Sequence, residues 1–259
     1  VLAQEVQGLV IHNQLKGIYL IEETDVDYVV QAYGGELWHE FVKHCIAQGW
    51  SGLENMALIP GSVGAAPVQN IGAYGLELKD FFDSLQAFNI RTGEWREFSR
   101  EECRFAYRDS VFKHEAKDYL ITSIRMRLPK AWKAKMGYAD LTNYVGLSET
   151  SSAQEIFDAV CAIRQAKLPD PVALGNAGSF FKNPIVATEH YEQLKTQFPK
   201  IVAYAQEDGR YKLAAGWLID QCGWKGRDLG PAGVHTNQAL VLVNRGGATA
   251  NDIEKLAQA

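Results

Sequence analysis

A serine set among small residues is the most informative candidate for a catalytic residue in this sequence. It lies in the segment Gly175-Asn176-Ala177-Gly178-Ser179-Phe180-Phe181-Lys182-Asn183-Pro184. Small residues let a ligand or another backbone segment approach closely, and Lys182 and Asn183 offer donors to an anion. The serine could give a proton to a bound ligand while the two phenylalanines exclude water. The alternative is a structural serine in a buried glycine-rich loop, and the segment alone favours neither.

A second segment, between Leu58 and Gly75, is rich in small residues and poor in charge. It reads Leu58-Ile59-Pro60-Gly61-Ser62-Val63-Gly64-Ala65-Ala66-Pro67 and then Gln69-Asn70-Ile71-Gly72-Ala73-Tyr74-Gly75. Such a loop exposes backbone N–H groups, which suits a pyrophosphate or a flat heterocycle lying against the main chain. Its spacing matches neither the Rossmann fingerprint nor a P-loop. A long, tight surface loop is the alternative.

A third segment, Cys103-Arg104-Phe105-Ala106-Tyr107-Arg108-Asp109-Ser110, places two arginines beside two aromatic residues. Arginine is a planar donor suited to a carboxylate, a phosphate or a developing enolate. A solvated face with an Arg–Asp pair is the commoner outcome for such a string. Several further polar residues would be ordinary on their own: Tyr138, Lys167, Tyr204, His235 and Gln238.

Composition limits the class of protein. The 259 residues are 47% apolar and 22% charged, which is typical of a globular chain, and the net charge of -5 argues against non-specific nucleic-acid binding. No apolar run is long enough to cross a bilayer. The cysteines are far apart and form no CxxC pair, so we expect no metal site and a reduced, cytoplasmic setting; they are Cys45, Cys103, Cys161 and Cys222.

The elements that must position these segments can be predicted from periodicity and capping signals. Strands are predicted at 9–11, 17–21, 27–33, 84–90, 95–98, 119–128 and 239–243. Helices are predicted at 36–47, with Leu37, Phe41 and Cys45 on one face, and at 189–197 and 214–221. Capping boxes predict helices that begin near Ser99, Ser152 and Thr249. The Leu168-Pro169-Asp170-Pro171 segment ends a helix and marks a predicted domain boundary.

Taken together, these segments resemble the UDP-N-acetylenolpyruvoylglucosamine reductase family. Four blocks match in order: Gly52 to Gly75, Cys103 to Lys113, Lys167 to Pro184, and Lys212 to Asp220. The Gly137-Tyr138-Ala139-Asp140 segment resembles the type I subclass, in which such a tyrosine closes over the substrate.

The resemblance implies an α+β protein. Residues 1–168 would form an FAD-binding region of the vanillyl-alcohol-oxidase / p-cresol-methylhydroxylase type, and residues 169–259 a smaller α+β substrate-binding domain. The implied reaction is the NADPH-dependent reduction of UDP-N-acetylglucosamine enolpyruvate to UDP-N-acetylmuramate during peptidoglycan precursor synthesis. The implied partner is a small UDP-sugar, with no nucleic acid or membrane, and the implied state is a cytoplasmic monomer with non-covalent FAD.

The resemblance also implies residue roles. Arg108 would stabilise the charge that develops when hydride reaches the enolpyruvyl group, and Ser179 would then protonate the adjacent carbon. The FAD-binding residues would be Pro60, Gly61, Ser62, Gly64, Ala65, Ala66, Asn70, Gly72, Ala73 and Tyr74. The substrate-binding residues would be Tyr107, Tyr138, Lys167, Lys182, Asn183, Tyr204 and Gln238.

Two parts of the family pattern have no counterpart in these 259 residues. One is an N-terminal Gly-Ser-Asn flavin loop, and the other is a C-terminal strand with a catalytic glutamate, so we assign no residue to either. We therefore expect this exact chain to bind FAD weakly and to turn over poorly. The alternatives are an oxidase with flavin attached to His12 or His39, a non-catalytic UDP-sugar binder, and an inactive fragment.

Overall fold

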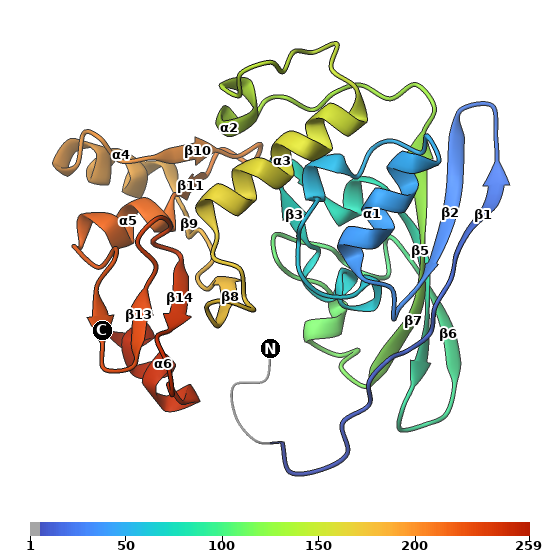
Figure 1. Cartoon of the computed structure of the whole chain (residues 1–259), viewed down its shortest axis with the longest axis horizontal. Helices are drawn as coiled ribbons and strands as arrows, with labels where there is room; N and C mark the ends of the chain where they lie inside the picture. Colours follow the sequence, from blue (N-terminus) through green and yellow to red (C-terminus); the bar gives the residue numbers. More distant parts are fainter. Residues whose placement is uncertain (1–5) are drawn as a thin grey trace. The chain divides into compact units, whose positions relative to one another are not determined.

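The computed structural model describes residues 6–259, and the chain divides into two compact units (Figure 1). Residues 11–164 form the first, here called the sheet unit. Residues 165–259, together with 6–10, form the second, here called the C-terminal unit. No helix among residues 6–259 has the length and apolar character that a membrane span requires.

A five-stranded antiparallel sheet is the framework of the sheet unit. Its order is β1(Ile18–Glu23), β2(Asp27–Tyr33), β7(Tyr119–Pro129), β5(Phe82–Asn89) and β6(Trp95–Ser99). From Ile124 to Leu128, alternate residues of β7 are buried, because successive side chains of a strand point to opposite faces. The other face is polar: Arg125 Nε donates to Gln31 Oε1 at 3.1 Å, and Arg127 Nη2 lies 2.7 Å from Asp83 Oδ1. This alternation is typical of an antiparallel sheet with one solvated face.

Helix α1(Trp38–Ala47) lies along the apolar face of the sheet (Figure 1). It buries Trp38, Phe41, Val42 and Cys45, while Leu37, which was predicted on the same face as Phe41 and Cys45, precedes the helix and is 56% exposed. The indole of Trp38 donates to Met56 O at 2.9 Å, which anchors the chain that leads into the small-residue loop. Two more helices follow, α2(Ala139–Thr142) and α3(Ala153–Lys167).

The C-terminal unit contains two small antiparallel sheets. One has the order β10(Ala203–Ala205), β11(Tyr211–Leu213), β9(Ile185–Val186), and it packs with α4(Thr188–Gln197) through Tyr191, Ile201 and Leu213. The other has the order β12(Asp228–Leu229), β13(Ala232–Val234), β14(Val241–Asn244), β8(Asn176–Ser179). Helix α6(Ala250–Gln258) covers this second sheet with Leu256, and α5(Ala215–Gln221) completes the unit.

Two of the three capping boxes open helices. Ser152 N donates to Glu155 Oε2 at 2.7 Å where α3 begins, and Thr249 makes the equivalent contacts at α6. The box at Ser99 was expected to open a helix, and this is wrong. Its reciprocal bonds to Glu102 form, but the chain makes only turns there, because Arg104 adopts a left-handed backbone (φ 46°) that cannot continue a helix.

The predicted strand at 9–11 is also absent. Residues 9–11 are exposed, and no strand pairs with them. Apolar character alone was therefore not enough to predict a strand here. The Ser179 segment was expected to be a loop, whereas its first part is the short strand β8. The assignment of cofactor to residues 1–168 and substrate to residues 169–259 stays a prediction.

Gly64 gives a direct test of the fold beside the small-residue loop. A Cβ at Gly64 would stand 2.9 Å from Ile121 O and 3.0 Å from Gly34 O, both of which are backbone atoms. We expect Gly64→Ala to lower the free energy of unfolding by about 1–3 kcal/mol, as overpacking does. Gly137→Ala is the matched control, because a Cβ there meets nothing within 4 Å. Urea denaturation of both variants measures the difference, and equal effects would contradict the packing argument.

Candidate active site

The predicted cofactor loop is built from short, tight elements. Two 3₁₀ helices, Val63–Ala65 and Pro67–Gln69, lead into the two-stranded hairpin of β3(Gly72–Ala73) and β4(Leu76–Glu77). Not every small residue there is free to face a ligand. Gly64 is needed for packing on the sheet, and a Cβ at Gly72 would stand 2.5 Å from Leu76 O. Gly61 and Gly75 differ, because both have positive φ and open space where a Cβ would stand.

Asn70 joins this loop to the arginine segment. It is fully buried and has a left-handed backbone with φ 44°. Its Nδ2 donates to Glu77 Oε2 and to Ala106 O, each at 3.0 Å, and its Oδ1 accepts from Lys79 N at 3.0 Å. The Asn70 side chain therefore shapes the loop from within, and its predicted contact with a cofactor stays a prediction.

Arg108 lies against the same loop. Its Nη2 donates to Gly72 O at 2.5 Å, and its Nη1 lies 3.5 Å from Asn70 O and 3.8 Å from Glu77 Oε1. The Arg108 guanidinium carbon is 5.2 Å from the centre of the Tyr107 ring. About 29% of the Arg108 side chain is exposed. The structure thus brings together two segments that the sequence predicted to act together, and it adds Glu77, which no motif indicated.

The far end of the loop meets three further side chains. Asn55 Nδ2 donates to Tyr74 O at 2.9 Å, the Tyr138 ring contacts the Tyr74 ring edge-on at 5.3 Å, and the Tyr74 hydroxyl is hydrogen-bonded to Arg164. Burial raises the pKa of Tyr74. Asn55 and Arg164 were not predicted, since a buried asparagine and an arginine inside a helix carry no sequence pattern of their own.

His39 contacts Leu58, the first residue of the small-residue segment. Its Nδ1 accepts from Leu58 N at 3.1 Å, and its ring stacks on Phe157 at 5.3 Å. Leu58 has φ 54°, so this contact supports a strained residue. Burial lowers the pKa of His39, which favours the neutral ring that can accept this bond. The Nδ1 lone pair is therefore used within the protein, which argues against a covalent flavin at this atom.

Ser179 lies at the end of β8 in the C-terminal unit, opposite Val241 of β14. The next residue, Phe180, donates its N–H to Leu240 O at 2.8 Å. Gln238 Oε1 lies 3.3 Å from Leu240 N, so Gln238 belongs to the same end of this sheet. Ser179 is exposed, and the Phe180 and Phe181 rings contact each other at 5.0 Å while remaining 44% and 37% exposed.

The other predicted substrate residues are spread over the C-terminal unit. Asn183 Oδ1 accepts from Ala215 N at 3.0 Å at the start of α5, and Tyr204 lies opposite Lys212 with 44% exposure. Lys167 is the last residue of α3, and Lys182 is exposed. Their predicted roles stay predictions.

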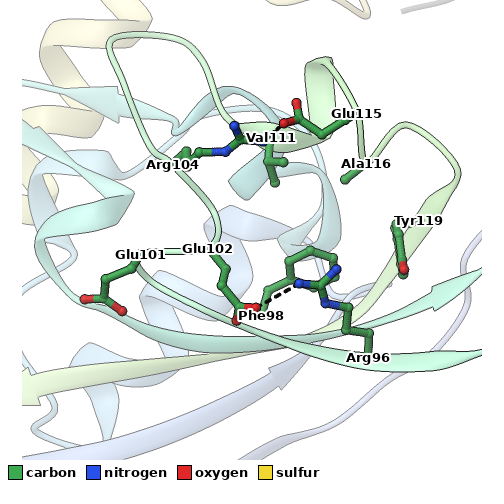
Figure 2. Close-up of a pocket in the computed structure, with 9 residues that line it drawn as sticks. All are labelled: Arg96, Phe98, Glu101, Glu102, Arg104, Val111, Glu115, Ala116 and Tyr119. Carbon is green, nitrogen blue, oxygen red and sulfur yellow. Dashed lines mark hydrogen bonds and ion pairs between the residues drawn. The ribbon is translucent and has the colours of Figure 1, made fainter.

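A separate cavity of about 310 Å³ opens elsewhere in the sheet unit (Figure 2). Two ion pairs line it, Arg96 with Glu102 at 2.8 Å and Arg104 with Glu115, and the Arg96 guanidinium lies over the Phe98 ring. None of the residues that line this cavity belongs to the predicted site. The cavity therefore does not identify a ligand for the cofactor loop.

The residues of the loop fit FAD. Gly61 and Gly75 present bare backbone to solvent, and Tyr74 and Tyr138 supply aromatic surface next to it. Asn55 Oδ1, which lies beside Tyr74, is buried without a hydrogen-bond partner. Backbone donors, aromatic rings and spare polar atoms are what a flat, polar heterocycle with a diphosphate needs.

Comparisons with known proteins agree on one family. Residues 170–259 match the family model "UDP-N-acetylenolpyruvoylglucosamine reductase, C-terminal domain", and residues 1–99 match "FAD binding domain". The chain is 57% identical over 261 residues to the UDP-N-acetylenolpyruvoylglucosamine reductase of Bordetella pertussis, covering all of this chain and 74% of that protein. It is 56% identical over 264 residues to that of Paraburkholderia phytofirmans, covering all of this chain and 76% of that protein.

A solved structure also matches, the UDP-N-acetylenolpyruvylglucosamine reductase of Thermus caldophilus. The TM-score is 0.59 at 26% identity, and the match covers 87% of this chain and 65% of that one.

The His39 contact predicts a pH dependence of stability. Because the pKa of His39 is lowered on folding, folding favours the neutral ring, so its contribution to stability is present above the unfolded value near 6.5 and is lost as pH falls below it. We expect His39→Gln to reduce the difference in unfolding free energy between pH 8 and pH 5, measured by urea titration at each pH. An unchanged pH dependence in this variant would contradict the role given to His39.

Proposed function

Because the chain belongs to the UDP-N-acetylenolpyruvoylglucosamine reductase family, we propose that Arg108 and Ser179 carry the chemistry of its reaction. The protein is a flavin-dependent oxidoreductase that reduces the enolpyruvyl group of a UDP-sugar for peptidoglycan synthesis. When bound, FAD supplies the two-electron transfer, from NADPH to the enolpyruvyl double bond. The chain itself must bind and orient the ligands, stabilise charge and deliver one proton.

The observation that carries this proposal is the fixed position of Arg108 against the cofactor loop. Its guanidinium is held by Gly72 O, with Asn70 O and Glu77 nearby, while part of the side chain is exposed to solvent. When electrons reach the enolpyruvyl double bond, negative charge develops on the carbon next to the substrate carboxylate. A cation held in place before the reaction stabilises this charge without reorganising.

Ser179 is the proposed proton donor. A serine hydroxyl is a weak acid in water, but a carbanion-like carbon is a much stronger base, so the transfer is favourable where water is excluded. Ser179 is exposed, and the Phe180 and Phe181 rings lie next to it in sequence. Bound substrate would therefore complete the dry surroundings that this proton transfer requires.

The remaining assignments follow the same proposal. The loop residues from Pro60 to Tyr74 would hold FAD. Tyr107 and Lys182 would set the geometry around the reacting group, and the UDP part would be bound by Tyr138, Lys167, Asn183, Tyr204 and Gln238. That the protein acts as a cytoplasmic monomer, without nucleic-acid or membrane partners, stays a prediction.

Ser179→Ala separates the two half-reactions. We expect flavin reduction by NADPH to proceed at the wild-type rate, because Ser179 is assigned no part in it, while reduction of the enolpyruvyl substrate stops. Stopped-flow absorbance of the flavin band measures the first step, and product chromatography measures the second. Loss of both steps together would contradict the role of Ser179 as proton donor.

Arg108→Lys tests the cation. Lysine keeps the charge but not the planar donor pair that Gly72 O orients, so we expect kcat to fall about 10²- to 10³-fold. Arg104→Lys is the matched control, because Arg104 lies in the same segment, also has a left-handed backbone and pairs with Glu115 away from the loop. Steady-state kinetics give kcat for both variants. Equal losses of kcat would mean that any change in this segment lowers the rate, which would contradict the role given to the Arg108 cation.

A further inference from the structure

Arg164 is a buried cation for which neither the fold nor the proposed chemistry accounts. It lies near the end of α3, and burial lowers the pKa of its guanidinium. Its Nε is buried without a hydrogen-bond partner, and none of the ion pairs within residues 6–259 includes it. Burying a charge is unfavourable unless it is paired. The group that Arg164 does contact is the hydroxyl of Tyr74.

Tyr74 is strained in a way that needs support. Its φ is 47°, and a bulky residue in the left-handed region is a genuine outlier that persists only when its surroundings determine it. Three contacts do so: Asn55 Nδ2 holds the Tyr74 carbonyl, the Tyr138 ring holds the Tyr74 ring, and Arg164 holds the hydroxyl. Asn55 is fully buried, so this support comes from within the sheet unit.

We propose that Arg164 is a positioning residue for the cofactor loop, acting through the Tyr74 hydroxyl. The inference rests on the proposed function, in which the loop binds FAD. Helix α3 is continuous from Ala153 to Lys167, so it offers a rigid point from which Arg164 fixes the end of the loop. Tyr74 lies next to Gly75, where a Cβ would meet nothing within 4 Å. A displaced Tyr74 would therefore shift the exposed backbone that the loop presents to the cofactor.

A double-mutant cycle tests this coupling. Tyr74→Phe removes only the hydroxyl, and Arg164→Met removes the guanidinium while keeping an apolar stem. We expect each change to raise the Kd for FAD about tenfold, because each removes the same hydrogen bond to a charged group. The double variant should also bind about tenfold more weakly than wild type, since residues of one contact are not additive. Titration of the apoprotein with FAD, followed by flavin fluorescence, gives the four values.

Two further variants separate positioning from general stability. Arg164→Lys should recover part of the FAD affinity, because it restores a charged donor to the Tyr74 hydroxyl. Arg125→Met is the matched control, since Arg125 lies on the polar face of the sheet and contacts Gln31, and it should leave the Kd unchanged. Thermal unfolding of each variant shows whether it folds, and Tyr74→Phe keeps the test valid if Arg164→Met does not.

The outcomes distinguish this inference from the proposed function. If the wild-type chain shows no FAD binding, the proposed cofactor role of the loop fails. If wild type binds FAD and the losses in the double variant multiply to about a hundredfold, Arg164 acts independently of Tyr74, as a direct ligand contact would, and the positioning role is overturned. Unchanged affinity in both single variants would overturn it as well.

Discussion

The amide of Asn70 is the interaction on which the geometry of the cofactor loop depends. It is fully buried, and its two donated bonds join Glu77 and Ala106, which come from different segments of the chain. Its accepted bond from Lys79 N fixes the turn that follows the hairpin. Because buried polar groups are costly when unpaired, these three bonds allow one arrangement of the two segments. Ala106, which Asn70 holds, lies two residues before Arg108, whose Nη2 donates to Gly72 O.

Strain is concentrated around this interaction. Five non-glycine residues in the described part of the chain have positive φ, and three of them, Asn70, Tyr74 and Arg108, are residues of the predicted site. Each is held by side-chain or backbone contacts from another segment, such as Asn55 Nδ2 to Tyr74 O at 2.9 Å. Left-handed backbone at such residues is unfavourable by roughly 1–3 kcal/mol each, and it persists where neighbours determine it and function benefits. The strain therefore supports the same location for the site as the motifs do.

The sequence predicted what depends on local pattern. Strand 27–33 was placed at its observed limits, because β-branched and aromatic residues and a following glycine pair are local signals. The same reasoning failed at Ser99, where the left-handed turn at Arg104, five residues later, overrides a correct capping box. For the site, small residues and arginines indicated the two segments that meet. Glu77, Asn55 and Arg164 were missed because their importance comes from contacts made across the fold, which no spacing encodes.

Ser179 is exposed, whereas the proton transfer proposed for it requires that water be excluded. In its proposed role as proton donor, the Ser179 hydroxyl needs an acceptor far more basic than water, and in the free chain water reaches it. Gly178 before it has φ 70°, so the strand ends in a conformation that presents the serine rather than burying it. A proton donor that is exposed until substrate arrives does not need to have an altered acidity of its own. The selectivity of the transfer then comes from the substrate, which brings the strong base and displaces the water at the same time.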